Sequence, residues 1–364
     1  MPRIDAFLKL GREQGCTDVH FAVGMPPLLR LLGELSPIKY RPLTEQELTS
    51  LIDEILTVQQ REDLRAGQDL DLSYEGEGIG RFRVSLYRKI GGPGAAFRLI
   101  PATIPSLDDL GMPPSVRKFL DHSQGLILVT GATGTGKSTT LNAMLDQLNR
   151  SRRLNIITLE DPIEQVHQSQ LSLVVQRQVG LHVESYAEGL RAALREDPDV
   201  ILVGELRDPE TIMMAMTAAE TGHLVLGTLH TSTAAKTLDR IIDAMPTTLK
   251  AQASLFLAQH LRGVISQKLV RTADGRSRKA IVEVFVNTPA IANLILSGKV
   301  FQITAVMQTG RDKGMQLMDQ ALMEALQRKE IDPDDAYLHA TEKQQFQRFV
   351  TDPDLLPQVN LAVT

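Results

Sequence analysis

A run of eight residues has the composition of a loop that holds phosphate groups. It matches the pattern G-x-x-x-x-G-K-[ST], follows an apolar stretch and opens a helical one. The run consists of Gly131, Ala132, Thr133, Gly134, Thr135, Gly136, Lys137 and Ser138, and Thr139 follows it. Glycines let backbone N–H groups converge on phosphate oxygens, and the N-terminus of the following helix adds a favourable partial charge. The run therefore predicts a site for a nucleoside triphosphate.

Two side chains of this loop have further predicted roles. Lys137 is expected to neutralise the β and γ phosphates, and the Ser138 hydroxyl is expected to bind Mg²⁺. We find no Asn-Lys-x-Asp segment of the kind that reads guanine. The expected ligand is therefore ATP with magnesium.

Charged residues also follow three predicted strands, at the point where each strand ends. They are Glu160, Asp161 and Glu164 after 156–159, Glu205, Arg207 and Asp208 after 200–203, and His230 after 224–228. In an open α/β sheet the ligand binds beyond the carboxyl ends of the strands, so these groups are expected near the phosphates. Hydrolysis needs one carboxylate to position or deprotonate water and another at the hydrated magnesium. Glu164 and Glu205 fit these two roles, and the spacing leaves open which residue takes which.

Two histidines bracket the last of these strands. His223 and His230 are seven residues apart, which at about 3.3 Å per residue separates them by roughly 23 Å. They cannot share one metal ion or one phosphate oxygen. We therefore expect His230 near the nucleotide, whereas His223 at the other end suits a structural or inter-subunit role equally well.

Three arginines in the first hundred residues are further candidates. Arg81, Arg83 and Arg98 lie on predicted strands. A neighbouring subunit can use such arginines to complete a nucleotide site in trans. For each of them, an ordinary surface role is the alternative.

Two domains position these residues. Residues 1–100 mix helical and period-two patterns and predict a compact α+β domain, with strands at 70–74, 81–87 and 95–100. Residues 101–114 carry four prolines and read as a linker. From 115 to 364, short apolar strands alternate with helices, which predicts a mostly parallel sheet covered by helices. Beyond Ala234 the pattern is mainly helical, with one hairpin around Asp274-Gly275.

Two helix starts are predicted from capping boxes. Thr44 precedes Glu47 by three residues, and Ser185 precedes Glu188 by three. Each pair predicts a helix N-terminus at which the two side chains accept hydrogen bonds from backbone N–H groups.

Composition excludes several classes of protein. The net charge of -5, the pI near 5.9 and the absence of tryptophan argue against nucleic acid as a partner. The single cysteine, Cys16, cannot form a four-cysteine zinc site or an internal disulfide. No signal peptide is evident, and the apolar runs are far shorter than the roughly 20 residues that span a bilayer. We expect a cytoplasmic protein whose membrane contact is peripheral.

With these motifs in place, the chain resembles the PilT-like retraction ATPases of type IV pili, within the secretion ATPase superfamily. The resemblance includes the phosphate loop, the acidic box 160–164, the Walker B segment 200–208 and the histidine box 221–231. It implies a PAS-like N-terminal domain joined to a RecA-like ATPase domain. It also implies a homo-hexamer with nucleotide bound between the domains.

The resemblance assigns roles to individual residues. Glu164 is implied as the general base and Glu205 as the Walker B residue at magnesium. His230 is implied to sense the γ-phosphate, with His223 supporting it. Arg81, Arg83 and Arg98 fall in the region that supplies nucleotide-contacting arginines. Hydrolysis is implied to move domains in the ring and to act on a PilC-like platform protein at the inner face of the cytoplasmic membrane.

Other features distinguish branches of the superfamily. Assembly and secretion ATPases usually carry an extra N-terminal domain and a tetracysteine loop, whereas here the PAS-like segment comes first and Cys16 is the only cysteine. Retraction is therefore favoured. Residues 290–297 depart from the Ala-Ile-Arg-Asn-Leu-Ile-Arg-Glu segment of retraction motors, because Ala292 and Leu296 replace its arginines and Ser297 its acid. With residues 274–289 and the extended tail, this favours a PilU-like accessory ATPase as the alternative, and a paralogous retraction ATPase as a further candidate partner.

Overall fold

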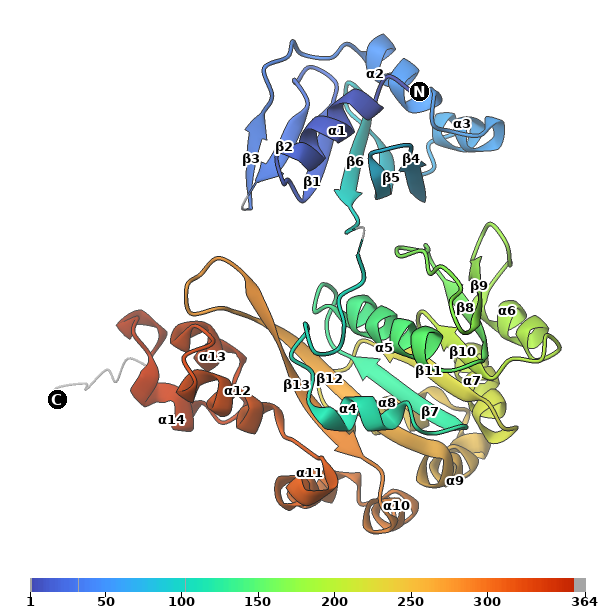
Figure 1. Ribbon diagram of the computed structural model, residues 1–364, viewed down its shortest axis with the longest axis vertical. Helices are drawn as coiled ribbons and strands as arrows, with labels where there is room; N and C mark the ends of the chain where they lie inside the picture. The colour runs from blue at the N-terminus through green and yellow to red at the C-terminus, as the bar shows by residue number, and fades with distance from the viewer. Residues whose placement is uncertain (1, 32, 102, 357–364) are drawn as a thin grey trace. The chain divides into compact units, whose positions relative to one another are not determined.

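The computed structural model describes residues 2–31, 33–101 and 103–356, which form two compact units (Figure 1). Unit 1 comprises Met1–Ile104 together with Pro162–Val166. Unit 2 comprises Pro105–Asp161 and His167–Thr364. The end of the tail that resembles the accessory ATPases, 357–364, lies outside the described residues. The short segment 162–166 therefore groups with unit 1, although its neighbours in sequence belong to unit 2.

Unit 1 is a six-stranded antiparallel sheet with three helices. The strand order is β3-β2-β1-β6-β5-β4. Its strands are β1 (Asp18–Ala22), β2 (Leu28–Leu31), β3 (Glu34–Pro37), β4 (Leu70–Gly76), β5 (Gly80–Lys89) and β6 (Gly92–Leu99), and its helices are α1 (Asp5–Glu13), α2 (Glu45–Asp53) and α3 (Val58–Arg65). Phe21, Phe82 and Phe97 are fully buried, and Phe97 meets the other two edge to face. The α+β pattern expected for this region is confirmed.

The two capping boxes differ in outcome. At α2, Thr44 Oγ1 accepts a bond from the Glu47 amide at 3.3 Å, and Glu47 Oε2 accepts one from the Thr44 amide at 3.0 Å. At α6 (Tyr186–Ala193), Ser185 Oγ accepts from the Glu188 amide, but the Glu188 carboxylate pairs with Arg191. The second box is therefore only half formed, because a guanidinium one turn along the helix binds the carboxylate.

Unit 2 contains a seven-stranded sheet in the order β13-β12-β7-β11-β10-β8-β9. Its strands are β7 (Gly125–Thr130), β8 (Asn155–Glu160), β9 (Leu173–Gln178), β10 (Val200–Val203), β11 (Leu224–Leu229), β12 (Leu261–Arg271) and β13 (Arg278–Val286). Only the β12–β13 hairpin is antiparallel; the other neighbours run parallel. The mostly parallel sheet and the hairpin are confirmed, while β9 and the length of β12 were not expected.

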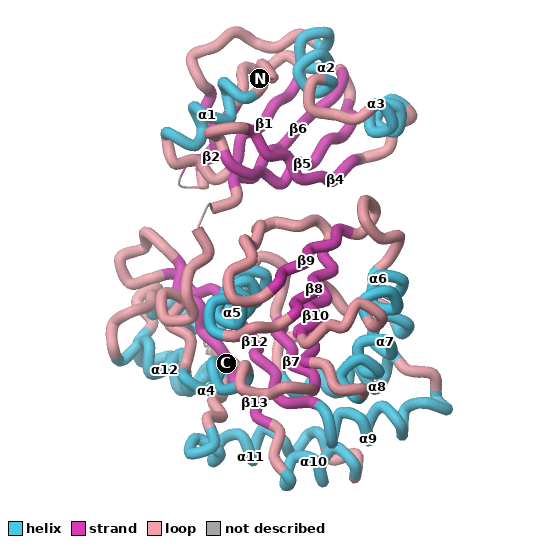
Figure 2. Tube along the Cα trace, turned by 45° about the vertical axis from the view of Figure 1, so that its right-hand side comes forward, coloured by secondary structure: helices cyan, strands magenta, loops and turns pink. Residues whose placement is uncertain are grey.

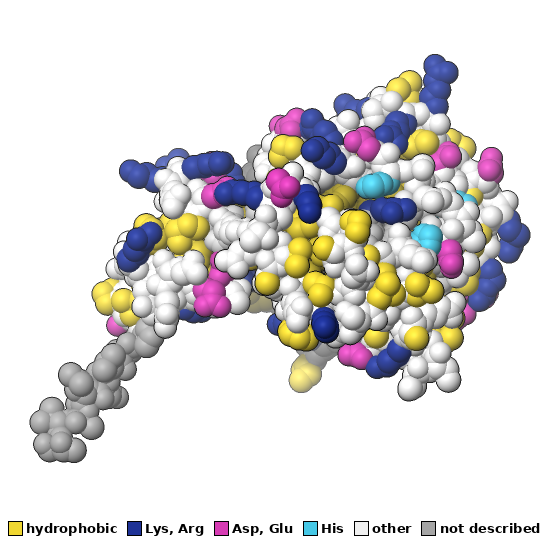
Figure 3. All heavy atoms as spheres, turned by 90° about the horizontal axis from the view of Figure 1, so that it is seen from below, with side chains coloured by type: hydrophobic (Ala, Val, Ile, Leu, Met, Phe, Trp, Pro, Cys, Tyr) yellow, Lys and Arg dark blue, Asp and Glu magenta, His cyan; other side chains and the backbone are white. Residues whose placement is uncertain are grey.

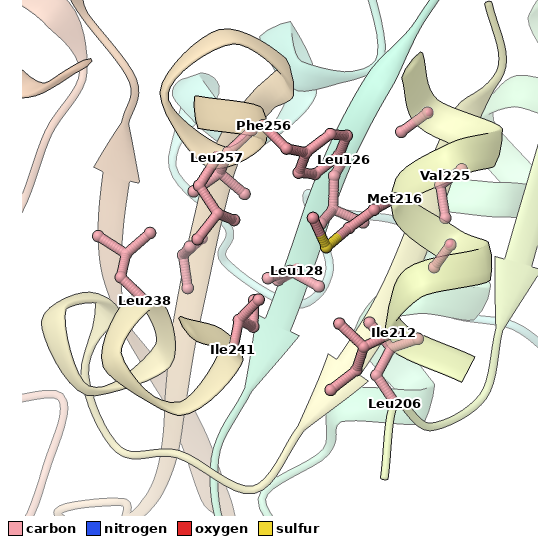
Figure 4. Close-up of a cluster of buried hydrophobic side chains, with 14 of the residues drawn as sticks. Leu126, Leu128, Leu206, Ile212, Met216, Val225, Leu238, Ile241, Phe256 and Leu257 are labelled. Atoms are coloured by element: carbon pink, nitrogen blue, oxygen red, sulfur yellow. The ribbon is translucent and has the colours of Figure 1, made fainter. Parts of the chain in front are cut away.

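Alternate residues of the buried strands face two separate layers of helices. Ile127 and Val129 pack with α4 (Pro114–Phe119) and α5 (Lys137–Ser151). Leu126 and Leu128 face the opposite way, into a core closed by helices that include α7 (Pro209–Glu220), α8 (Ala234–Ala244) and α9 (Lys250–His260) (Figures 2 and 4). This alternation is the period of two expected of a strand covered on both faces.

The rest of unit 2 is helical. It contains α10 (Pro289–Leu296), α11 (Ile303–Thr309), α12 (Met318–Gln327), α13 (Pro333–His339) and α14 (Lys343–Phe346), with 3₁₀ turns at Thr247–Leu249, Val300–Gln302, Gly310–Lys313, Gln347–Phe349 and Pro353–Leu355. Figure 3 views the molecule from the side of α9, α10 and α11, where apolar side chains are scattered among charged ones. No helix in the described residues is both long and apolar enough to cross a bilayer.

Candidate active site

The phosphate loop connects the buried strand β7 to α5, and its shape depends on glycine. Gly131, Gly134 and Gly136 have φ angles of 147°, 80° and 86°, where other residues are strained. A Cβ atom on Gly131 would also lie 2.5 Å from the carbonyl oxygen of Gln267. Only glycine fits this position, which keeps the loop closely packed on β12.

Lys137 lies inside the loop that it is predicted to serve. Its Nζ donates to the carbonyl oxygens of Gly131 and Ala132 at 2.9 and 3.0 Å. Burial lowers the pKa of the Lys137 ammonium, and the charge of Glu205 opposes that shift. Ser138 and Thr139 are exposed in the first turn of α5. The loop thus presents an ammonium group, a hydroxyl group and a helix N-terminus together, as a phosphate site requires.

Gln267 is a residue that sequence reasoning missed. It lies on β12, is 3 % exposed, and forms hydrogen bonds at both ends of its amide. Its Oε1 accepts from Thr140 Oγ1 at 2.8 Å, and its Nε2 donates to the Thr135 carbonyl oxygen at 2.7 Å. Gln267 therefore ties the phosphate loop and the first turn of α5 to the neighbouring strand. The available signal was the polar stretch 266–268, which lies between the apolar pairs 264–265 and 269–270.

Glu205 is a largely buried carboxylate of unit 2. It follows β10, and its side chain is 16 % exposed. Glu205 Oε1 lies 2.7 Å from Arg207 Nε and 2.9 Å from His230 Nε2. Burial acts to raise the pKa of Glu205, but the hydrogen bond and charge of Arg207, together with His230, outweigh it and hold the pKa below its usual value. The carboxylate therefore stays ionised, and its position is fixed by two partners.

The two histidines lie at opposite ends of β11, as their spacing predicted. His230 follows the carboxyl end and contacts Glu205. His223 precedes the amino end, and its Nδ1 donates to the Ala218 carbonyl oxygen at 2.9 Å, at the end of α7. In this structure His223 secures the turn between α7 and β11, and only His230 joins the carboxylate cluster.

Glu164 belongs to unit 1, with the segment Pro162–Val166. Its Oε1 lies 3.4 Å from Arg83 Nη1, and both side chains are about one-third exposed, at 36 % and 37 %. The segment is held by its backbone, because the Ile163 carbonyl oxygen accepts bonds from Arg81 Nε at 3.1 Å and Ser73 Oγ at 2.9 Å. The carboxylate of Glu164 is therefore presented by an anchored loop but is itself loosely paired.

The three candidate arginines share one face of the unit 1 sheet. Arg83 on β5 and Arg98 on β6 are directly opposite in register, and Arg81 lies two residues before Arg83. Arg98 Nε pairs with Asp18 Oδ1 at 3.0 Å, and Arg81 Nη1 with Glu75 Oε2 at 3.3 Å. The structure thus groups the arginines with the Glu164 segment, as a cationic face of unit 1.

The oxygen groups of unit 2 fit a magnesium ion that is shared with phosphate. Ser138 supplies an exposed hydroxyl group, and Glu205 an ionised carboxylate, which are the hard donors that Mg²⁺ prefers. Within the described residues, no cluster of three or more His, Cys, Asp or Glu side chains could hold a metal by itself. The donor set therefore suits a metal that arrives with a nucleotide.

Comparison with protein families gives an independent result. Residues 33–351 match the family model described as "Type II/IV secretion system protein". The chain is 46% identical over 319 residues to the "Type IV pilus retractation ATPase PilT" of Pseudomonas aeruginosa, which covers 88% of this chain and 92% of that protein. It is 38% identical over 336 residues to the "Type IV pilus ATPase PilU" of the same organism, covering 92% and 88%.

A solved structure is similar over nearly the same length. The pilus retraction motor PilT with bound ADP matches with a TM-score of 0.88 at 39% identity, covering 96% of this chain and 99% of that one. The similarity therefore extends over both units of the chain, including the elements that carry the phosphate loop.

Proposed function

The chain belongs to the type II/IV secretion system protein family, and from this premise we propose that it is an ATP-hydrolysing motor for type IV pilus retraction. The observation that supports this most directly is the unit 2 cluster, in which the phosphate loop and the doubly held Glu205 lie at the carboxyl edge of one sheet. This arrangement accompanies 46% identity, over 88% of the chain, to a retraction ATPase. The protein is an ATP hydrolase that converts turnover into force.

Within unit 2, we assign nucleotide binding to the phosphate loop. The amides of Gly131–Ser138 and the Lys137 ammonium bind the phosphates of ATP, with Thr139 at the start of the helix. Ser138 and Glu205 would hold Mg²⁺, which, when bound, neutralises charge on the β and γ phosphates. Because Arg207 and His230 both contact Oε1 of Glu205, the Oε2 atom is the one assigned to the metal and its water.

His230 is assigned to sensing the γ-phosphate. It contacts Glu205, so a change in the charge beside that carboxylate reaches the imidazole directly. His223 supports it from the far end of β11 by holding the preceding turn. The two histidines act through β11, which lies between them, and they do not bind a common ligand.

In unit 1, we assign Glu164 as the general base that takes a proton from the attacking water. Its loose pairing with Arg83 supports this, because a base must exchange partners during turnover. We assign a nucleotide-contacting role to Arg81, Arg83 and Arg98, which would neutralise the negative charge of a nucleotide bound in the same protomer or in a neighbour. The cationic face that they form supports this role.

The assembly and partners are proposed on the basis of the family to which the chain belongs. We propose a homo-hexameric ring, since a head-to-tail contact that closes gives cyclic symmetry. The ring works in the cytoplasm, peripherally at the inner face of the membrane, on a PilC-like platform protein of the pilus. Residues 101–114 act as the linker between the PAS-like domain and the RecA-like domain.

A PilU-like accessory ATPase is the second candidate. It is favoured by α10, where Ala292 and the half-exposed Leu296 stand in place of the two arginines of retraction motors. In this case the ring would act beside a paralogous retraction ATPase. The higher identity to PilT keeps the principal motor first.

Fluorescence imaging of pili tests the proposal. Cells that lack this chain, or carry only the Lys137→Ala form, should have long pili that fail to retract. Retraction that persists but weakens would support the accessory role. Loss of pili altogether would contradict retraction, because the motor would then drive extension.

A further inference from the structure

Glu283 is a carboxylate on β13 to which the proposed mechanism gives no role. It is 6 % exposed and lies opposite Ser266 of β12. The next pair on the same face of the hairpin, Val264 and Phe285, belongs to the apolar core that α8 helps to close. Moving a carboxylate out of water into such a core costs free energy unless hydrogen bonds compensate for it. The groups that Glu283 binds therefore show what its burial achieves.

The carboxylate of Glu283 binds the first residue of each of two helices. Its Oε1 accepts from the backbone N–H of Ala234, at the start of α8, at 2.8 Å, and the backbone N–H of Met318, at the start of α12, donates to the same carboxylate. N–H groups in the first turn of a helix have no partner within the helix. Burial raises the pKa of Glu283, and the two hydrogen bonds oppose that rise. One side chain thus fixes the starting points of two helices on the sheet.

Neither helix depends on Glu283 for its own cap. At α8, Thr233 Oγ1 accepts from the backbone N–H of Lys236 at 3.3 Å. At α12, Gln320 Oε1 accepts from the backbone N–H of Leu317 at 3.0 Å. Residues of each segment therefore cap its helix, and what Glu283 adds is the position of the two N-termini relative to β13.

The position of α8 determines where His230 lies. Only four residues, 230–233, connect the end of β11 to the start of α8. His230 is the first of them, and its Nε2 lies 2.9 Å from Glu205 Oε1. The segment is also tied to the helix, because Thr231 Oγ1 lies 2.7 Å from Thr237 Oγ1 on α8. A shift of the N-terminus of α8 would therefore move His230 relative to Glu205.

We propose that Glu283 is a positioning residue for ATP hydrolysis, which holds the N-termini of α8 and α12 on β13 and thereby keeps His230 in place against Glu205. The inference rests on the roles proposed above for His230 and Glu205. It adds that α12, the first of the helices α12 to α14, is held by the same carboxylate as the segment that carries His230. A displacement of α12 would therefore reach the hydrolytic site through Glu283.

Glu283→Gln tests the proposal with a side chain of nearly the same size. An NH₂ group replaces one of the two acceptor oxygens and the charge is lost, so the hold on the two helices weakens. Calorimetry on the full chain with ATP and Mg²⁺ should give binding within a fewfold of wild type, because the contacts of the phosphate loop are retained. Single-turnover hydrolysis should slow roughly ten- to hundredfold, as expected when a group at the reacting site is displaced. Equal losses of binding and rate would overturn the positioning role.

The His230→Ala background shows whether Glu283 acts through the histidine. Glu283→Gln should slow hydrolysis when His230 is present and should cause no further loss in His230→Ala, because the two effects are coupled. Equal slowing in both backgrounds would overturn the proposal. A normal rate in His230→Ala alone would overturn the role proposed for His230, and with it the inference that depends on that role.

Glu330→Gln is the matched control. Glu330 Oε2 pairs with Lys279 Nζ of the same strand β13 at 3.1 Å, but both side chains are about one-third exposed. This variant should bind and hydrolyse ATP as the wild type does. Thermal unfolding shows whether each variant is folded, and if Glu283→Gln is not, Glu283→Asp makes the same comparison with a side chain one methylene group shorter. An unchanged single-turnover rate in the folded Glu283 variant would overturn the proposal.

Discussion

The two carboxylates assigned to hydrolysis, Glu205 in unit 2 and Glu164 in unit 1, differ in how firmly their side chains are held. Glu205 in unit 2 is 16 % exposed, with partners at 2.7 and 2.9 Å, whereas Glu164 in unit 1 is 36 % exposed, with one partner at 3.4 Å. In unit 2, Lys137 and Gln267 also hold the phosphate loop through hydrogen bonds, whereas in unit 1 the partner of Glu164 is Arg83, on a sheet face that carries other arginines. The difference supports the proposal that unit 2 is organised in advance to bind nucleotide, whereas unit 1 supplies groups that exchange partners during turnover.

The largest expected effect comes from removing the ammonium group of the phosphate loop. Lys137→Ala should weaken ATP binding by about a hundredfold, because the phosphates lose a charge-assisted donor. Equilibrium binding of a fluorescent ATP analogue measures this. Arg153→Ala, a surface change beyond α5, serves as the control. Full binding by Lys137→Ala would refute the assignment of the phosphate loop.

Removing Arg207 should change the pH dependence of turnover. Arg207 and His230 hold the pKa of Glu205 down against burial, so in Arg207→Ala that pKa rises and Glu205 becomes protonated at a higher pH. The acid limb of the rate profile should therefore move up by about one pH unit. Steady-state rates between pH 5 and 8 measure this. Arg195→Ala, whose guanidinium bonds a backbone carbonyl on α6, should leave the limb in place.

The Gln267 contacts predict a loss of both stability and affinity. Gln267→Ala leaves the buried Thr140 hydroxyl without its acceptor and should lower the free energy of unfolding by about 1–3 kcal/mol. ATP binding should weaken severalfold because the loop loses its anchor at Thr135. Combining it with Thr140→Ala in a double-mutant cycle isolates the pair. Additive effects would show that the two side chains do not cooperate.

The smallest effect on stability is expected at the unit 1 pair. Arg83→Ala should change the free energy of unfolding by less than about 1 kcal/mol, because both partners are about one-third exposed. Turnover should nevertheless fall, since Arg83 is assigned to the charge of the nucleotide. Chemical denaturation and steady-state rates measure the two quantities. A large loss in the free energy of unfolding would show that the Arg83–Glu164 pair of unit 1 is held as firmly as Glu205 is in unit 2.

Local motifs explain which parts of the site were predictable. The phosphate loop is one contiguous run of residues. Glu205 and His230 follow strands whose carboxyl ends meet at one edge of the sheet, so their positions in the sequence were enough to predict that they lie close together. Gln267 comes from a strand about 130 residues away and acts through tertiary hydrogen bonds, which a linear pattern does not show.

In the fold, too, features with a local sequence pattern could be predicted and features that depend on tertiary contacts could not. The strands with continuous apolar runs, such as β10 and β11, were predicted nearly to the residue. β9 is only partly buried, and Ser266, Gln267 and Lys268 interrupt the apolar run of β12, so both lacked a clear strand signal. The grouping of Pro162–Val166 with unit 1 depends on contacts of its backbone with Ser73 and Arg81, which no sequence pattern encodes.

The division of labour between the units is tested most directly by Glu164→Gln, measured for both ATP binding and single-turnover hydrolysis in parallel with Lys137→Ala. The account predicts that Glu164→Gln binds ATP within a fewfold of wild type but hydrolyses it roughly 10²- to 10⁴-fold more slowly, as expected for a lost general base. Lys137→Ala should fail at binding. A near-normal rate in Glu164→Gln would contradict the account and move the base to another carboxylate.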